Sequence, residues 1–386
     1  MKFVIAPDSF KESMSAKKAA TAIESGIHAI FPDAVCTIVP MADGGEGTVE
    51  SLTSMSDGDI VKVEVVGPLG EAVTAEYGII DHGEIAVIEM ASASGIELIS
   101  SQERDPLITT TYGTGQLIKH ALDSGVKRIL IGIGGSATND AGAGMLQALG
   151  VSFKDQNGKE LPYGGGALDL LAEIDISGLD SRIKEVQIDV ACDVSNPLIG
   201  SNGASAIFGP QKGATPETVE ILDRNLAHFA ELVKRELNLD IAHMEGAGAA
   251  GGLGGGLLAF LNARLKKGIE LVIEYTGLEE HIKDADYVFT GEGSIDSQTI
   301  FGKTPYGVAT IAKKYNIPVF AVAGKIGEGV EPLYDIGFTS IFGILKGAVQ
   351  LEEALKEGEM NLTFTVKNIC RLINKLRGET NETTIG

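Results

Sequence analysis

The sequence predicts an α/β fold in which largely parallel sheets alternate with helices, and three observations support this prediction. Short apolar runs rich in β-branched residues alternate with amphipathic helical patterns near both ends of the chain. Glycine is unusually common, with 50 residues in 386, and it clusters where apparent strands meet apparent helices. Loops at such junctions need positive φ or a close approach of backbone to a ligand. The chain is also longer than one domain of about 150 residues, so we expect two or three domains.

The two ends of the chain together predict one parallel sheet of the Rossmann or flavodoxin type. Near the N-terminus we expect strands at 3–6 and 36–39, and helices at 16–31 and 45–53. Near the C-terminus we expect strands at 286–290, 318–323 and 339–344, each followed by a helix. We therefore assign residues 1–60 and 285–386 to one discontinuous α/β domain.

The middle of the chain predicts a second, mixed α/β domain that is inserted into the first. Residues 60–90 alternate between apolar and polar side chains with a period of two, and turn sequences interrupt them, which predicts an antiparallel hairpin or meander. Beyond it we expect helices at 113–124 and 216–237 and strands at 128–133 and 186–191. The predicted inserted domain covers residues 61–284.

The composition excludes several classes of partner. A formal net charge of −22 argues against nucleic acid and against anionic membranes, because both bind basic surfaces. No apolar run reaches membrane-spanning length, and the N-terminus has no signal-peptide pattern, so we expect a cytoplasmic protein. Cys36, Cys192 and Cys370 are widely spaced, and no two histidines form a ligand pair at helical spacing. We therefore expect reduced thiols and neither a disulfide framework nor a zinc site.

The segment from Asp286 to Thr304, DYVFTGEGSIDSQTIFGKT, suits an anionic phosphate and its metal. A short apolar strand enters a loop that carries Glu292 and Asp296, and Lys303 and Thr304 follow just before a helical pattern. Helix N-termini and lysines favour phosphate, and carboxylates are ligands of Mg²⁺.

The same segment is not a Walker A loop, because that motif requires glycine where the chain has Ser297. An ordinary helix entry with a solvated lysine is the alternative interpretation. What favours a phosphate site is that the pattern recurs elsewhere in the chain.

Loops with carboxylates, hydroxyls or glycines follow other predicted strands as well. The carboxyl ends of parallel strands are where α/β proteins bind ligands. One such loop alone is explained by ordinary turn and cap chemistry, whereas five together favour a binding site. Besides the segment from Asp286 to Thr304, four loops supply candidates: Asp8, Ser9 and Lys11 in PDSFKES, Asp43 and Glu46 in MADGGEG, Gly134, Gly135, Ser136, Thr138, Asn139 and Asp140 in GGSATNDAG, and Asp193, Ser195 and Asn196 in ACDVSNPL. A sixth loop, TTTYGTG, adds Thr111.

Two glycine motifs raise the alternative of an NAD-dependent oxidoreductase. GAGAAG at 246–251 fits the dinucleotide fingerprint but follows no predicted strand, so tight helix packing is the better interpretation. The glycine turn at 132–137 does follow a strand, but it lacks a convincing acidic residue downstream. No G-x-S-x-G elbow occurs, which disfavours serine hydrolysis. Carboxylates, lysines and glycines without histidine suit phosphoryl transfer better.

Six motifs carry a resemblance to a known family: PDSFKESMSA, PMADGGEGT, TTTYGTGQLI, GIGGSATNDAGAGML, ACDVSNPL and TGEGSIDSQTIFGKTP. In this order they resemble the bacterial class I glycerate kinases, from Lys2 to about Leu376 and without a departure in any motif. The resemblance implies two α/β domains with the active site in the cleft between them. It also implies ATP-dependent phosphorylation of D-glycerate, with 2-phosphoglycerate as the usual product. Formation of 3-phosphoglycerate, or action on a related small hydroxy acid, is the nearer alternative.

For such a kinase we assign roles to the candidate residues. The general base is Asp193 or Asp296, and the sequence does not separate them. Lys11 and Lys303 neutralise phosphate oxygens, and Asp43, Glu46 and Glu292 are the candidate ligands of Mg²⁺. The remaining loop residues, with Gly291 and Gly293, are expected to bind glycerate or ATP. Whether the protein forms a homodimer stays open.

Overall fold

The computed structural model describes residues 1–42, 47–55 and 58–382. The chain divides into two compact units, which we call unit 1 and unit 2. Unit 1 comprises residues 1–43 and 272–386, and unit 2 comprises residues 44–271. The predicted domain boundaries, at 60/61 and 284/285, lie at other residues and stay a prediction.

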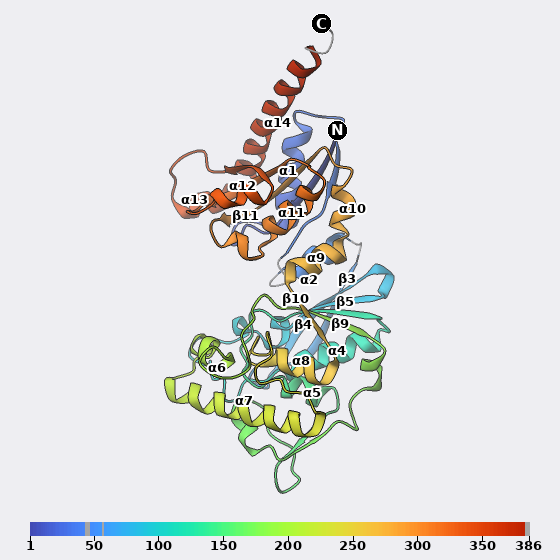
Figure 1. The fold of residues 1–386 in the computed structure, drawn as a ribbon, viewed down its shortest axis with the longest axis vertical. Helices are drawn as coiled ribbons and strands as arrows, with labels where there is room; N and C mark the ends of the chain where they lie inside the picture. The colour runs from blue at the N-terminus through green and yellow to red at the C-terminus, as the bar shows by residue number, and fades with distance from the viewer. Residues whose placement is uncertain (43–46, 56–57, 383–386) are drawn as a thin grey trace. The chain divides into compact units, whose positions relative to one another are not determined.

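Unit 1 is built on a five-stranded sheet in which every pair of neighbouring strands is parallel. Figure 1 labels β11 of this sheet together with the helices α1, α11 and α14. The strand order is β13 (Phe338–Gly343), β12 (Val319–Ile326), β11 (Tyr287–Ile295), β1 (Lys2–Pro7) and β2 (Val35–Ile38). Strands from the two ends of the chain therefore lie side by side, because β1 pairs with β11. This confirms the single parallel sheet that the sequence predicts.

Helices cover this sheet and close its core. α1 and α14 pack against each other, and their buried side chains form a core with Phe3, Ile5 and Phe289 of the sheet. α11 contacts β1, β11 and β12. The helices of this part of the chain are α1 (Ala16–His28), α10 (Leu278–Ile282), α11 (Thr304–Lys314), α12 (Glu331–Ile336), α13 (Leu351–Lys356) and α14 (Gly358–Glu382).

Unit 2 contains a mixed six-stranded sheet. Its order is β10 (Arg264–Lys266), β9 (Gln187–Ala191), β6 (Arg128–Gly132), β5 (Ile85–Glu89), β4 (Ala72–Ile80) and β3 (Asp59–Val66). The first four strands are parallel, whereas β4 is antiparallel to both of its neighbours, β5 and β3. The meander predicted at 60–90 is thereby confirmed. A separate hairpin pairs β7 (Ser152–Lys154) with β8 (Glu173–Asp175).

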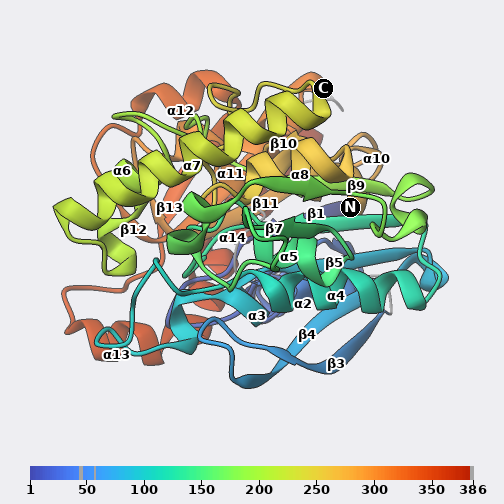
Figure 2. The same cartoon turned by 90° about the horizontal axis from the view of Figure 1, so that it is seen from below.

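One large core holds the helices of unit 2 to its sheet. α7, the long helix that crosses the view in Figure 2, packs through Phe229 against Phe153 of β7 and Phe260 of α8. The helices are α2 (Thr48–Met55), α3 (Ala91–Ser94), α4 (Tyr112–Asp123), α5 (Ala143–Ala148), α6 (Ala204–Phe208), α7 (Pro216–Leu237) and α8 (Leu253–Leu261), and α9 (Gly268–Thr276) crosses the division between the units.

Two element boundaries differ from the prediction in ways that matter for the site. β11 continues to Ile295, because it pairs with β12 as far as Ile326, and Glu292 therefore lies within a strand and not in a loop. α1 ends at His28, earlier than predicted. No helix among the described residues is long and apolar enough to cross a membrane.

Candidate active site

The carboxyl ends of β1 and β11 bring acidic residues from both ends of the chain together in unit 1. Pro7 lies opposite Gly291 in the parallel register, and the Asp8 amide donates a hydrogen bond to the Gly291 carbonyl over 2.8 Å. Thr304, the first residue of α11, donates its hydroxyl to Asp8 Oδ2 over 2.5 Å. Asp8 is therefore fixed at the strand ends beside β11, as the strand-end rule for α/β sheets predicts.

Glu292 is a carboxyl group of this cluster whose pKa is raised well above its ordinary value. Its side chain is largely buried, Thr299 Oγ1 donates to its Oε1 over 3.4 Å, and Lys303 Nζ lies 3.5 Å from its Oε2. Burial raises its pKa, the Lys303 ammonium opposes that effect and the negative charge of Asp8 adds to it, and together these effects bring the pKa to about 7. The group thus stands near half-protonation at neutral pH, and an added cation would favour its charged form.

The other predicted residues of unit 1 surround these strand ends. Asp296 is half-buried and accepts hydrogen bonds from the Gln298 amide (2.8 Å) and the Ser294 hydroxyl (3.3 Å). Lys11 is exposed, and a Cβ built at Gly293 would lie 3.5 Å from its amide nitrogen, so this loop passes directly beside β11. A Cβ at Gly291 would lie 2.2 Å from the Val322 carbonyl oxygen, so strand packing requires glycine there.

Two predicted metal ligands, Asp43 and Glu46, lie outside the described residues. The chain before them does reach the same strand ends, because the Met41 amide donates to the Pro7 carbonyl over 2.9 Å. Their place in the site therefore stays a prediction. Ser9, also predicted, is half-buried next to Asp8, whose Oδ1 accepts its amide over 2.6 Å.

In unit 2, the loop after β6 presents its glycines and holds its polar side chains inside. Gly134 and Gly135 are exposed, and Gly135 has a φ of 72°, which favours glycine. Ser136, Thr138 and Asn139, by contrast, are buried. Of their atoms, the buried Thr138 Oγ1 and Asn139 Oδ1 have no hydrogen-bond partner.

Asp140 and Thr111 form a buried network that supports the same loop. The Asp140 carboxylate accepts from the Thr111 amide (2.9 Å), the Thr111 hydroxyl (2.8 Å) and the amides of Gly142 and Gly144. Burial raises the pKa of Asp140, and these four donors oppose that shift. Both residues therefore hold the loop from within. The helix that follows, α5, has only six residues, so the loop backbone is the feature offered to a ligand.

Lys212 contacts this loop, and its role was not predicted from the sequence. Its side chain is buried, and its Nζ donates to Ser136 Oγ over 2.8 Å and to the Thr138 carbonyl over 2.6 Å. Burial lowers its pKa to about 7, against which the Asp140 charge acts weakly. Pro-Gln-Lys-Gly has the composition of an exposed turn, so no local pattern signals a buried lysine there.

The loop after β9 carries the second candidate base. Asp193 is exposed, and its Oδ1 accepts the Gly268 amide at the start of α9 over 3.0 Å. Ser195 is exposed, and Asn196 donates its side-chain amide to the Asn202 carbonyl over 2.8 Å. These contacts fix the loop but do not choose between Asp193 and Asp296.

The GAGAAG segment packs against the loop after β6. Residues 238–250, which the structure describes throughout, form turns and irregular chain and no strand. A Cβ at Gly251 would lie 2.0 Å from the Thr138 carbonyl oxygen, and one at Gly248 would lie 2.0 Å from the Pro197 carbonyl oxygen. The glycines therefore serve close packing, as predicted, and the strand that a dinucleotide fingerprint needs is missing.

A surface groove of about 850 Å³ also lies in unit 1, between α1 and α14. None of the predicted site residues lines it. We therefore place the candidate active site at the strand ends and not in this groove. The lining residues are Lys17, Lys18, Thr21, Ala22, Ser25, Lys346, Glu359, Met360, Thr363, Phe364 and Lys367.

Carboxylates, lysines and glycines at the ends of parallel strands, without a histidine among the described residues of these loops, define a phosphotransferase of the α/β class. The model of the glycerate kinase family matches residues 3–374. The chain belongs to the glycerate kinase family.

Individual relatives and a solved structure agree with this membership. The chain is 54% identical to a glycerate 2-kinase of Escherichia coli K12, over 96% of this chain and 97% of the relative. It is 53% identical to a glycerate kinase of Bacillus subtilis 168, over 97% and 98% of the two chains. A crystal structure of a protein assigned as glycerate kinase 2, from Salmonella typhimurium LT2, is 52% identical, covers 98% of this chain and 99% of its own, and superposes with a TM-score of 0.91.

Proposed function

We propose that this protein transfers the γ-phosphoryl group of ATP to the C2 hydroxyl of D-glycerate, giving 2-phosphoglycerate and ADP. The observation that carries the proposal is the 54% identity to a glycerate 2-kinase over nearly the whole of both chains. The strand-end cluster of carboxylates and lysines in unit 1 supports it, since phosphoryl transfer depends mainly on positioning and charge neutralisation.

In this reaction the substrate hydroxyl oxygen forms a bond to the γ-phosphorus while the bond from that phosphorus to the leaving ADP oxygen breaks. The hydroxyl proton passes to a carboxylate, and Asp193 or Asp296 takes it. Both are accessible, and both are oriented by a backbone amide, from Gly268 and Gln298 respectively. The Oδ2 of Asp296 also accepts the Ser294 hydroxyl over 3.3 Å, so Asp296 would take the proton in exchange for that weak hydrogen bond.

The described residues fit a bound Mg²⁺. Glu292 and Asp8 supply carboxylate oxygens, the donor type that Mg²⁺ prefers. The charge of Asp8 raises the pKa of Glu292, and a nearby dication would relieve that unfavourable interaction. When bound, the ion would neutralise charge on the phosphates of ATP. We propose Glu292 as a ligand, and Asp43 and Glu46 as further ligands from the sequence.

Lys303 and Lys11 would bind the phosphates of ATP. Lys303 precedes α11 and its Nζ lies between Glu292 Oε2 and the Ser294 carbonyl, 3.3 Å from the latter. Lys11 is exposed in the loop beside Gly293, so its ammonium group is free to reach an anion. Gly293 would let the nucleotide approach the backbone and Ser9 would add a hydroxyl, whereas Gly291, also predicted to bind it, is buried against Val322 within the sheet.

The loop after β6 would bind an anionic group of a substrate, either phosphate or the glycerate carboxylate. Its exposed glycines, Gly134 and Gly135, offer backbone without side chains, and Ser136 follows them. The unpaired atoms of Thr138 and Asn139 mark polar capacity that the folded chain leaves unused. Lys212, Asp140 and Thr111 would act as positioning residues beneath the loop, and Ser195 and Asn196 would add contacts from the loop after β9.

The purified protein, incubated with ATP, Mg²⁺ and D-glycerate and followed by phosphorus and carbon NMR, tests the proposal. We expect ADP and a phosphorylated glycerate whose C2 resonance shows coupling to phosphorus. Phosphorus coupling at C3 instead of C2 would identify the product as 3-phosphoglycerate. ADP formed only with another hydroxy acid would overturn the substrate, and no ADP with any acceptor would overturn the kinase. Reduction of NAD by glycerate would instead favour the oxidoreductase alternative.

Homodimer formation is a further proposal. α14 exposes about half of each of Met360, Phe364, Leu372 and Leu376. A second copy would cover part of this exposed apolar surface. Light scattering after size exclusion measures the mass directly, and a monomer at all concentrations would exclude the dimer. The cytoplasmic location stays a prediction from the sequence.

A further inference from the structure

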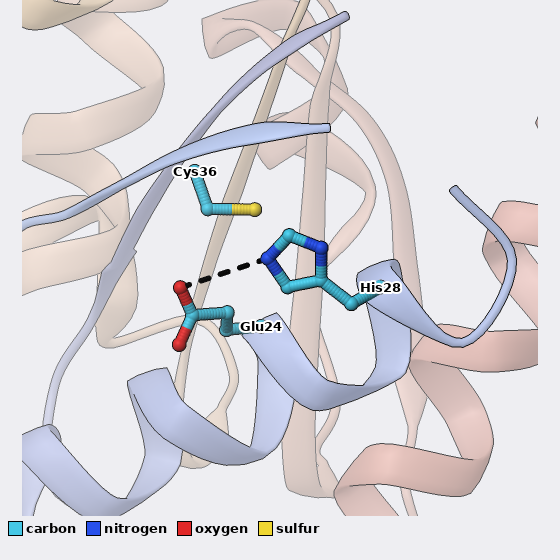
Figure 3. A group of neighbouring side chains, drawn as sticks. All are labelled: Glu24, His28 and Cys36. Carbon is cyan, nitrogen blue, oxygen red and sulfur yellow. Dashed lines mark ion pairs between the residues drawn. The ribbon is translucent and has the colours of Figure 1, made fainter. Parts of the chain in front are cut away.

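We propose that Glu24, His28 and Cys36 form a binding site for a zinc-like divalent cation in unit 1, separate from the strand-end cluster. One ligand atom of each residue lies within 4.8 Å of the others. Figure 3 shows the Cys36 thiol and the Glu24 carboxylate both directed toward the imidazole of His28. Nothing in the proposed kinase reaction uses these three residues.

The backbone places the three side chains so that they can converge on one ion. Glu24 and His28 stand four residues apart on α1, which puts them on one face of the helix, and His28 Nε2 lies 3.9 Å from Glu24 Oε1. Cys36 is fixed independently, because it pairs with Phe3 in the sheet. Zinc bonds of about 2.0–2.3 Å place tetrahedral ligands roughly 3.3–3.8 Å apart, so small side-chain rotations suffice.

To bind a metal ion here, the Cys36 thiol would have to lose its proton. Burial, and then the negative charge of Glu24, raise the pKa of the Cys36 thiol to about 11, so the thiol is protonated at neutral pH. A dication bound between the groups reverses that balance, because thiolate and carboxylate then both face positive charge. Binding would therefore release the thiol proton to solvent. The buried Cys370 thiol of α14 also faces this cluster, because the charge of Cys36 adds to burial in raising the pKa of Cys370.

The donor set selects the class of metal. A thiolate, an imidazole and a carboxylate suit Zn²⁺ and its spectroscopic substitute Co²⁺, whereas Mg²⁺ takes oxygen ligands. Each of the three residues is half-buried, so a water molecule can complete a tetrahedral site. The bound ion would tie the last turn of α1 to the second residue of β2 and stabilise this side of unit 1.

Cobalt binding to the purified full chain tests the site. Protein freed of metal by a chelator and kept reduced by a non-chelating phosphine would be titrated with Co²⁺. We expect a thiolate-to-cobalt charge-transfer band in the near ultraviolet that saturates at one equivalent and disappears when Zn²⁺ is added. A titration without that band overturns the proposal.

Variants separate this site from other metal-binding groups. Cys36→Ser should abolish the charge-transfer band, whereas the matched control Cys192→Ser, which changes the half-buried thiol of unit 2, should retain it. Glu24→Gln and His28→Gln should each weaken cobalt binding at least tenfold. Glu292→Gln should leave the band unchanged, because that residue belongs to the strand-end cluster. A band that survives Cys36→Ser would refute the assignment.

Stability and activity provide independent readouts. Zn²⁺ should raise the melting temperature of the wild-type protein by a few degrees and that of Cys36→Ser by less, because a ligand that binds only the folded chain stabilises it. Circular dichroism of the metal-free variant shows whether it folds. Kinase activity of Cys36→Ser in Mg²⁺ alone should equal that of the wild type, so a failed kinase assay and a failed metal site are distinguishable.

Discussion

Two buried carboxyl groups, Glu292 in unit 1 and Asp140 in unit 2, share one property and differ in another. Burial raises the pKa of both. Asp140 accepts four hydrogen bonds, three of them from backbone amides, and is 1% exposed. Among the residues that the structure describes, Glu292 accepts a weak hydrogen bond from the Thr299 hydroxyl and has the Lys303 ammonium 3.5 Å away. The chain therefore uses the hydrogen-bonding capacity of Asp140 internally and leaves most of the capacity of Glu292 for a ligand.

The lysines repeat the same contrast. About a third of the Lys303 side chain is exposed, whereas Lys212 is buried and bound to Ser136 and Thr138. We infer that unit 1 holds charge ready for a charged ligand, while unit 2 uses buried charge to hold a loop in shape. Substitutions in unit 1 should accordingly affect turnover at little cost to folding, and substitutions in unit 2 should affect both.

The largest effect is expected at the general base. One candidate, Asp296, lies in unit 1 and the other, Asp193, lies in unit 2, so this experiment tests the comparison of the two units directly. Asp193→Asn and Asp296→Asn both preserve an oxygen that can accept the backbone amide now bound, and each variant removes the negative charge together with the proton-accepting role. The true base should lose about 10²–10⁴-fold in kcat, and the other residue should lose little. Steady-state kinetics of both variants gives the answer. Equal, mild losses would mean that neither aspartate is the base.

Lys303→Ala should lower kcat by about 10²–10³-fold, because it removes one preorganised positive group at the phosphates. The fold should persist, since the side chain is partly exposed and its ion pair is not buried deeply. Lys314→Ala is the matched control. Lys314 is an exposed lysine at the end of α11, the helix that Lys303 precedes, and it pairs with Glu279. Near-normal turnover of Lys303→Ala would remove this lysine from the mechanism.

Glu292→Gln should change how stability depends on pH. The pKa of Glu292 is about 7 when folded and 4.5 in its ordinary state. Between these values the folded chain binds the proton more strongly, so the wild type loses stability as the pH rises from about 4.5 to about 7. The loss should approach about 3 kcal/mol, and Glu292→Gln should escape it.

Melting curves of both proteins across that range, with and without Mg²⁺, measure the effect. The Gln variant should melt at a higher temperature than the wild type near pH 8 and not near pH 5. Mg²⁺ at pH 8 should stabilise the wild type more than the variant if Glu292 is a ligand. Parallel curves for the two proteins would show that Glu292 ionises like an exposed glutamate.

Much of the fold could be predicted because it follows local patterns. The period-two alternation at 60–90 specifies the meander, and the apolar runs before Asp8 and Glu292 specify central parallel strands. The length of β11 could not be predicted in the same way. Its last residues are polar and rich in glycine, and only pairing with β12, far along the sequence, makes them a strand.

The candidate site shows the same limit. Residues whose role follows from their own loop, such as Lys303 before α11, are visible in the sequence. Lys212 is not visible, because its burial depends on a loop that precedes it by more than seventy residues. Nor is the cluster of Glu24, His28 and Cys36 visible, because a search for paired histidines overlooks a site in which a helix supplies a carboxylate and an imidazole and a strand supplies a thiol.

Lys212→Met carries the smallest expected effect and tests the unit 2 side of the comparison. Removing the ammonium leaves Ser136 Oγ and the Thr138 carbonyl without their donor, and the exposed glycines of the loop lose support from below. We expect kcat/KM to fall about tenfold, equivalent to about 1.4 kcal/mol of transition-state stabilisation. Lys159→Met, an exposed lysine in a turn of the same unit, is the control.

The pH dependence of stability distinguishes a positioning role of Lys212 from simple packing. Its pKa is about 7 when folded, below the ordinary 10.5. Between these values the unfolded chain binds the proton more strongly, so the wild type gains stability as the pH rises from about 7 toward about 10. Lys212→Met should lack that gain. The difference between the two melting temperatures should therefore grow in favour of the wild type as the pH rises. If the two curves stay parallel and kcat/KM is unchanged, the buried lysine does not hold the loop, and the contrast between the units reduces to burial alone.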